Sequence, residues 1–167
     1  SGASSIVTRH PIKTKDIDIE ASGASNILLA GLTTGVCEIE ASGSAKITVG
    51  KVTTNDMDIT ASGASKADIA GLTTDDCTIS VSGTAVATIP LLSTPKIDIE
   101  CSGASKAKID GQAGHTVVKT SGSSCCDITK LTISDGKMSA SGVSTIKANR
   151  TAAKCKVSTT GNAKVKY

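Results

Sequence analysis

The sequence predicts an all-β protein, a right-handed parallel β-helix of about eight coils that spans residues 1–167 as a single domain. A Ser-Gly pair followed by two small residues recurs at nearly constant spacing, and each interval contains two stretches in which apolar and polar residues alternate. A constant period of about 20 residues built from strand-like segments is typical of a solenoid, in which each repeat buries its apolar side against its neighbours. The repeats start at Ser1, Ser22, Ser42, Ser62, Ser82, Ser102, Ser121 and Ser141.

Each repeat is expected to supply two strands. KADIA at 66–70 and CTISV at 77–81 show the period-two alternation of a half-buried strand. When the repeats are aligned on Ser-Gly, the inward positions form columns of apolar residues. Such columns require each coil to lie in register on the one before, with parallel strands about 4.8 Å apart. The columns are Ile6, Ile27, Ile47, Ala67, Ala87, Ala107, Cys126, Ile146; Leu29, Val49, Ile69, Ile89, Ile109, Ile128; Ile17, Cys37, Met57, Cys77, Ile97; and Ile19, Ile39, Ile59, Ile79, Ile99, Val118, Met138, Val157.

Two further positions complete the expected coil. Leu32, Val52, Leu72, Leu92 and Leu131 lie between the two stretches and predict a third wall. The glycine of each Ser-Gly pair is expected in a turn that needs positive φ or close backbone approach. Parallel crossovers favour right-handed winding.

Composition limits the function. Aromatic residues make up 1% of the 167 residues, so the core must be aliphatic and thin, and the stacking platforms of single-strand nucleic-acid binding are missing. The net charge of +3 divides into −3 for residues 1–140 and +6 for residues 141–167. No run is long and apolar enough for a membrane helix, and no N-terminal apolar segment resembles a secretory signal. The chain is therefore expected to be either cytoplasmic or the product of signal removal. Because Ser1 already opens a repeat, we expect a processed chain that has lost an upstream piece. We expect no nucleic-acid partner, and membrane attachment only through a lipid anchor outside this chain.

Most of the six cysteines align with core columns and are interpreted as small hydrophobic residues. Cys37 and Cys77 lie two coils apart, about 9.6 Å by strand spacing, which is beyond disulfide reach. Cys125 alone falls in an outward column. Its thiol can be inert, or it can be reactive or paired, and the sequence leaves both interpretations open. No CxxC spacing supports a zinc site.

Nothing in the sequence indicates catalysis. His10 and His115 would stand about 24 Å apart along the axis, too far for one active site. No Gly-x-Ser-x-Gly elbow supplies a serine nucleophile. We therefore predict a protein that is not an enzyme, with no catalytic residue, no cofactor and no assigned metal.

The outward side of the second strand carries a ladder of acidic residues. Stacked carboxylates about 5 Å apart repel one another unless cations, lysines or solvent screen them. This ladder is the one candidate binding face, either for divalent cations or for a basic partner surface. Lys119, Lys137 and Lys156 continue the same face with the opposite charge. The ladder consists of Asp18, Glu20, Glu38, Glu40, Asp58, Asp98 and Glu100.

Several segments of the chain are similar to those of a known protein family. These are SGASK at 62–66 and 102–106, ADIAGLTT at 67–74 and the closing GNAKVKY at 161–167. It resembles the bacterial head GIN domain family of auto-transporter adhesins, common in Bacteroidetes. The resemblance covers nearly the whole chain and implies a right-handed parallel β-helix, export, and a periplasmic, outer-membrane or cell-surface location. It supplies no catalytic residues.

Three functions remain open at this point. The leading hypothesis is a non-enzymatic, exported adhesin-like or cell-envelope module that binds a surface component through ladders of polar side chains. The alternative is a bactofilin-like structural polymer that assembles end to end through unpaired strand edges. A polysaccharide lyase or hydrolase is disfavoured because such sites use clustered charged groups and aromatic platforms.

Overall fold

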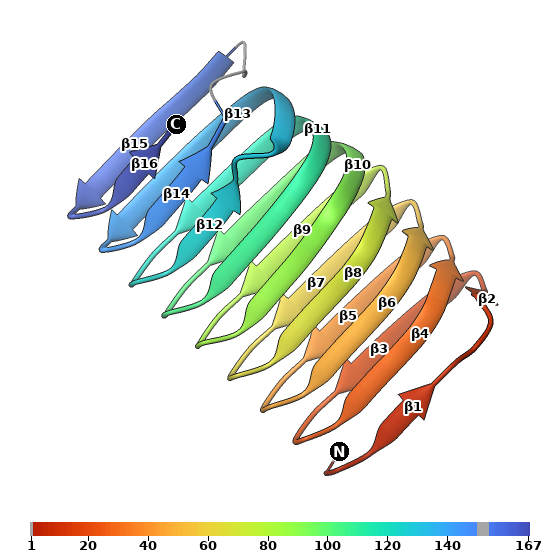
Figure 1. Ribbon diagram of the computed structural model, residues 1–167. Coiled ribbons are helices and arrows are strands. Elements are labelled where there is room, and N and C mark those ends of the chain that lie inside the picture. Colours follow the sequence, from red (N-terminus) through yellow and green to blue (C-terminus); the bar gives the residue numbers. More distant parts are fainter. Residues whose placement is uncertain (1, 150–153) are drawn as a thin grey trace.

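The chain forms a rod of stacked coils in a computed structural model that describes residues 2–149 and 154–167. The two termini lie at opposite ends of the rod (Figure 1). Every strand pairing among the described residues is parallel. These residues contain no helix, and so none with the length and apolar character to cross a membrane. The predicted all-β parallel solenoid of about eight 20-residue coils is confirmed.

The strands lie in two rows that share the interior (Figure 1). One row contains β1 (Ser5–Val7), β2 (Ile12–Lys13), β4 (Asn26–Thr33), β6 (Lys46–Thr53), β8 (Lys66–Thr73), β12 (Cys125–Ile128), β14 (Thr145–Ala148) and β16 (Lys164–Lys166). The other contains β3 (Asp16–Ala21), β5 (Val36–Ala41), β7 (Asp56–Ala61), β9 (Asp76–Val81) and β15 (Lys154–Gly161). Three longer strands, β10 (Val86–Cys101), β11 (Lys106–Thr120) and β13 (Leu131–Gly142), pass through the bend between the two rows.

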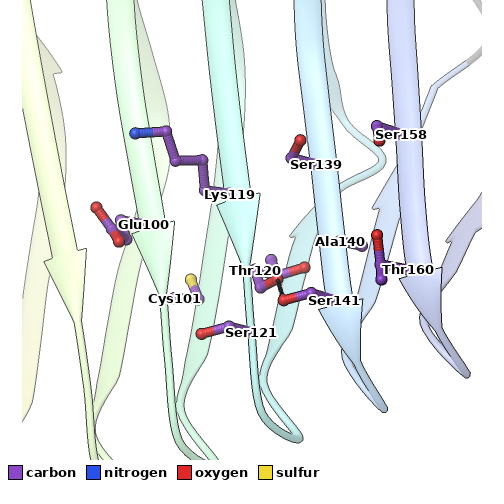
Figure 2. A pocket seen from close by; sticks show the side chains of 10 residues that line it. All are labelled: Glu100, Cys101, Lys119, Thr120, Ser121, Ser139, Ala140, Ser141, Ser158 and Thr160. Carbon is purple, nitrogen blue, oxygen red and sulfur yellow. Dashed lines mark hydrogen bonds between the residues drawn. The ribbon is translucent and has the colours of Figure 1, made fainter.

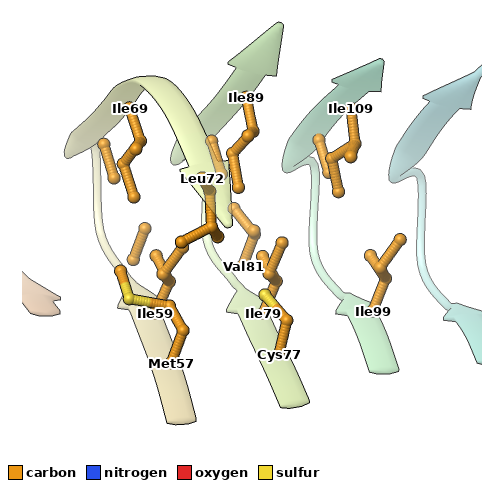
Figure 3. Close-up of a cluster of buried hydrophobic side chains, with 14 of the residues drawn as sticks. Met57, Ile59, Ile69, Leu72, Cys77, Ile79, Val81, Ile89, Ile99 and Ile109 are labelled. Atoms are coloured by element: carbon orange, nitrogen blue, oxygen red, sulfur yellow. The ribbon is translucent and has the colours of Figure 1, made fainter. Parts of the chain in front are cut away.

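The apolar columns pair in the register that the sequence predicts, but the prediction that Ile6 and Val157 are buried is wrong. These residues are 54% and 43% exposed, because β1 and β15 each pair with a neighbouring strand on one side only. Ile47 pairs with Ile27 below and Ala67 above, and Ile59 lies between Ile39 and Ile79. Their side chains meet between the two rows of strands, where Ile59, Ile69, Ile79, Ile89 and Ile99 form the centre of the core (Figure 3). The Leu32 column is also buried, but Leu32 belongs to β4 itself, so this position is a bend in the first strand rather than a separate wall.

A second buried column is polar. Thr34, Thr54 and Thr74 directly follow β4, β6 and β8, and Thr94 takes the equivalent position within β10; all four are buried. The Thr54 hydroxyl lies 2.9 Å from the carbonyl oxygen of Gly35 in the preceding coil and 2.9 Å from that of Asp56 in its own coil. The Gly35 carbonyl also accepts hydrogen bonds from the backbone N–H groups of Asn55 and Asp56. A buried hydroxyl without a partner is costly, so this position satisfies the threonine hydroxyl and links each turn to the coil before it.

The Ser-Gly corner is where successive coils touch most closely. Gly63 has a φ of 69°, and a Cβ at this position would lie 2.8 Å from the carbonyl oxygen of Gly43. Both predicted reasons for glycine, positive φ and close approach, therefore hold. Two residues later the hydroxyl of Ser65 is buried and donates a hydrogen bond of 2.9 Å to the carbonyl of Ala41.

The upper coils depart from the regular repeat without breaking the stack. The pairing of β10 with β11 shifts between Ile89 and Leu92, and Leu92 then pairs with Gly111. In the inward column that contains Ile97, the next coils carry Thr116 and then Gly136. The side chain of Ile133 reaches toward Gly136, its Cδ1 lying 3.5 Å from where a Cβ would be. A larger residue in one column thus replaces volume missing from the neighbouring one.

We predict that substitution by Asp has different effects on the free energy of unfolding at two adjacent residues of β8, one buried and one exposed. Ile69→Asp buries a carboxylate where the side chain is 2% exposed and should lower the free energy of unfolding by about 3–5 kcal/mol. Ala70→Asp places the carboxylate in solvent and should cost less than about 1 kcal/mol. Urea denaturation measures both. Equal costs would show that the register is wrong by one residue.

A second prediction concerns the glycine corner. Gly63→Ala adds both positive-φ strain and a Cβ that meets the backbone of Gly43, and should destabilise the chain by about 2 kcal/mol or more. Gly2→Ala is the matched control, because Gly2 has a φ of 86° but no atom within 4 Å of its Cβ position. It should cost about 1 kcal/mol. Thermal melts that show no difference between the two variants would contradict close coil contact as the constraint.

Candidate binding faces

The acidic ladder lies on the solvent side of the second strands, as predicted. Asp18, Glu38 and Asp58 stack on three successive coils. Glu20 and Glu40 stack beside them on β3 and β5. All five are exposed, and the register places them in two adjacent columns. The structure thus brings five of the seven predicted residues together on one face of coils 1–3.

The other two residues form a separate group on β10. Thr78 stands between Asp58 and Asp98, and Glu100 is separated from Glu40 by two hydroxyl residues. Asp98 is half-buried and Glu100 is exposed. The ladder is therefore interrupted in coil 4, and its second group has Lys119 as the neighbour of Glu100 in the next coil.

Three more carboxylates belong to this face and were missed in the sequence. Asp16, Asp56 and Asp76 begin their strands in a third outward column, two residues before Asp18, Asp58 and Thr78. The alternation itself carries this signal, since these residues share the parity of Asp18 and Asp58. Lys96, the next residue in the column, forms an ion pair of 2.6 Å with Asp76. The hydrogen bond and charge of Asp76 raise the pKa of Lys96 above its ordinary value.

The same face reverses its charge in the upper coils. Lys119 on β11, Lys137 on β13 and Lys156 on β15 are exposed and lie in the columns that carry acids below. His115 follows Lys96 in its column, and its Nδ1 lies 2.6 Å from a carboxylate oxygen of Asp135. The rod consequently has an acidic part over coils 1–5 and a basic part above it.

Within residues 2–149 and 154–167, no set of three or more His, Cys, Asp or Glu side chains is arranged to hold a metal ion. The carboxylates of the acidic ladder form open rows, and none of the seven is part of an ion pair among the residues that the structure describes. Such rows attract positive charge along their length, and neighbouring coils contribute repeated contacts rather than a cage.

The first strands present a second charged face. Lys46 and Lys66 are neighbours in one column, and Lys106 and Lys108 extend the basic face on β11. Lys66 also forms a 2.7 Å ion pair with Asp68 on its own strand. The two faces of the rod therefore differ in charge over the lower coils.

Two polar features at the edges of the rod were not predicted. At one edge of the second-strand face, a shallow groove of about 280 Å³ is lined by Glu100, Lys119, Ser139 and Ser158, which follow one another on β10, β11, β13 and β15 (Figure 2). At the bend, one exposed residue per coil forms an unbroken polar column through six coils. This column consists of Thr33, Thr53, Thr73, Ser93, Gln112 and Thr132.

The cysteines occupy the predicted positions. Cys37, Cys77, Cys101 and Cys126 are buried, whereas Cys125 is half-exposed in an outward column. Burial, with a smaller effect of nearby aspartates, raises the pKa of Cys37 to about 11 and that of Cys77 to about 12. These thiols stay protonated near neutral pH and are poor nucleophiles. His10 is exposed, and His115 lies five coils away.

The fold and its faces together define a class of protein: a parallel β-solenoid that displays in-register ladders of polar side chains. Residues 1–91 match the family described as "Putative auto-transporter adhesin, head GIN domain". This match covers more than half of the 167 residues, and the chain belongs to that family. No curated protein and no solved structure matches the chain. The predicted resemblance is confirmed over residues 1–91, and the family description fits an adhesin-like or structural module.

We predict that repulsion between neighbouring carboxylates of the acidic ladder lowers the stability of the folded chain, and that neutralising two of them raises it. Glu38 has Asp18 and Asp58 as column neighbours, and Glu40 has Glu20. The double variant Glu38→Gln with Glu40→Gln should raise the free energy of unfolding by about 1 kcal/mol at low salt. The gain should shrink at about 0.5 M salt, where exposed charges are screened.

Glu100→Gln is the matched control, because Glu100 lies between Ser80 and Lys119 in its column and has no acidic neighbour there. This variant should be neutral or slightly less stable. Thermal melts at two salt concentrations make the comparison. Equal stability of the double variant and the wild type at low salt would show that solvent already screens the ladder.

Proposed function

We propose that this chain is a non-enzymatic, exported adhesin-like module that binds a component of the cell surface or envelope through its polar ladders. The observation that carries this proposal is the in-register acidic face of coils 1–3, where five exposed carboxylates occupy two adjacent columns. Family membership supports it, since an auto-transporter adhesin head acts outside the cell or at its surface. The periplasm, the outer membrane and the cell surface are all consistent with this role.

The shape of the faces supports binding by many shallow contacts. A β-solenoid offers a flat, rigid wall whose side chains repeat at the strand spacing of about 4.8 Å. A basic partner surface opposite this wall would meet several carboxylates at once, each contributing modestly because the face is open to solvent. Recognition of this kind depends on the number of matched charges, and it weakens with salt.

The partner that this face fits is a surface component with repeated positive charge. Divalent cations would collect along the same rows and reduce the repulsion between the carboxylates. They would act as a diffuse layer, because the carboxylates form open rows rather than a coordination cage. Calcium should therefore raise the melting temperature mainly at low salt.

The test uses the 167-residue chain coupled to beads and an array of peptides and glycans of graded charge. The fourfold variant Asp18→Asn, Glu20→Gln, Glu38→Gln and Glu40→Gln should lose binding to basic peptides by at least about tenfold at low salt. Lys46→Gln with Lys66→Gln is the control on the other face and should bind as the wild type does.

Three outcomes would count against the proposal. Equal binding by the wild type and the fourfold variant would remove the acidic face as the binding surface. Release of shortened glycans from the array would indicate an enzyme. Concentration-dependent filaments in electron micrographs, together with no binding to the array, would favour the structural polymer.

A further inference from the structure

The solvent side of the second strands changes charge along the rod. It consists of three outward columns, whose lysines all lie in coils 5–8, whereas coils 1–4 carry carboxylates and no lysine in these columns. From coil 1 to coil 8 the columns of this second-strand face are Asp16, Val36, Asp56, Asp76, Lys96, His115, Asp135, Lys154; Asp18, Glu38, Asp58, Thr78, Asp98, Val117, Lys137, Lys156; and Glu20, Glu40, Thr60, Ser80, Glu100, Lys119, Ser139, Ser158.

Two copies of such a face can pack on each other about a two-fold axis in two orientations. With the rods parallel, every coil meets the same coil of the second copy, so the carboxylates of coils 1–3 meet carboxylates. With the rods antiparallel, coil 1 meets coil 8, coil 4 meets coil 5, and each column lies opposite its own reverse. Like charges that face each other oppose association and unlike charges favour it, so the charges select the antiparallel orientation.

In the antiparallel orientation each column is complementary to itself. The axis passes between coils 4 and 5, where Lys96 lies opposite Asp76 of the second copy. These two residues already form a 2.6 Å ion pair within one chain, so the axis brings together four alternating charges.

The charges away from the axis match as well. No two charges of the same sign lie directly opposite each other in the three columns. All the residues in the oppositely charged pairs are exposed except Asp76, which is half-buried. The pairs, each formed twice by symmetry, are Asp16 with Lys154, Asp18 with Lys156, Glu38 with Lys137 and Asp76 with Lys96.

The groove on the upper part of the face lies opposite long side chains of the lower part. Ser139 and Ser158 are short and line the groove of about 280 Å³ beside Lys119 (Figure 2). In the antiparallel orientation Glu40 and Glu20 of the second copy lie opposite these two serines. A carboxylate that enters the groove therefore meets hydroxyl donors.

A second hollow gathers positive charge at the top of the same face. It has a volume of about 520 Å³, and Val117 and Gly136 are among the residues that line it. The one acid in its lining, Asp135, lies 2.6 Å from Nδ1 of His115 in its own chain. Opposite the basic side chains of this hollow lie carboxylates of the second copy, which are Asp56 for His115, Glu38 for Lys137, Asp16 for Lys154 and Asp18 for Lys156.

The face is large enough for a specific dimer. Strands β3, β5, β7 and β9 have six residues each. Six residues extend over about 20 Å, and eight coils at the strand spacing extend over about 38 Å. The two faces would bury about 750 Å² per copy, against roughly 800 Å² per partner in protein–protein interfaces of standard size.

We infer that the second-strand face is a homodimer interface and that two copies of this chain associate through it with their rods antiparallel. A second copy is a partner whose charges match this face from coil 1 to coil 8. The inference follows from the columns of the chain itself and does not rest on the proposed binding role. Because the dimer covers the acidic ladder, it competes with a basic partner for the same face.

Sedimentation velocity of the 167-residue chain tests this association without any added ligand. In about 20 mM salt the sedimentation coefficient should rise with protein concentration toward that of a dimer, and about 0.5 M salt should weaken the association at least about tenfold. A chain that stays monomeric up to about 0.5 mM in low salt would overturn the inference. Species that grow beyond a dimer, as end-to-end stacking would produce, would also overturn it.

Reversal of charge tests the antiparallel pairing. The variant Asp18→Lys with Glu38→Lys places lysines opposite Lys156 and Lys137, and the variant Lys137→Glu with Lys156→Glu places carboxylates opposite Glu38 and Asp18. Each variant alone should associate at least about tenfold more weakly than the wild type. An equimolar mixture of the two should form a heterodimer, because every reversed residue then meets an opposite charge. Recovery in the mixture also shows that both variants are folded.

The matched control makes the same change of charge on the other face. Lys46→Glu with Lys106→Glu reverses two exposed lysines of the first strands and should dimerise as the wild type does. Loss of the dimer in this control would assign the interface to the first strands. A mixture of the two reversed variants that associates as weakly as each variant alone would exclude the antiparallel pairing.

Discussion

Close stacking at the Ser-Gly corner is the constraint on which the rest of the molecule depends. At this corner the backbones of successive coils approach so closely that a Cβ on Gly43, Gly63 or Gly83 would lie between 2.7 and 3.0 Å from a backbone oxygen below. The corner thereby fixes where each coil starts relative to the one before. Because side chains alternate between faces along a strand, a coil that slipped by one residue would exchange its core and its surface. The apolar columns and the charged faces both require the same registration.

The columns could be predicted because their residues have one physical preference. Isoleucine, leucine and valine favour burial, so a column that repeats them every 20 residues has one reasonable interpretation. The column of Thr54 and its equivalents could not be assigned to the interior in this way, since threonine is found on both faces of strands. Its inward position becomes evident only when the backbone shows two carbonyl oxygens within 2.9 Å of the hydroxyl. The sequence contains the threonines, but the carbonyl oxygens near their hydroxyls are brought together only by the folded turn.

Only part of the acidic face was predicted, because a column is recognised in the sequence only when it repeats one kind of residue. Asp18, Glu38 and Asp58 repeat the same charge in one column, whereas the neighbouring column contains Asp16, Val36, Asp56 and Asp76 and then changes to Lys96. A column of mixed composition gives little signal until the pairing is known.

The order of charges along the second-strand face gives the rod a direction. Acids occupy the columns of Asp18 and Glu20 in the lower coils, and Lys119, Lys137 and Lys156 occupy the same columns above. A partner with uniform positive charge would be attracted to one end and repelled from the other. A partner whose charges also change sign along its length would match the whole face in one orientation, since the reversed orientation would place like charges together. Under the proposed binding role, the selectivity of this face would come from the position of the sign change, which Lys119 makes in coil 6. The registration of the coils aligns this lysine with the acids of the lower coils.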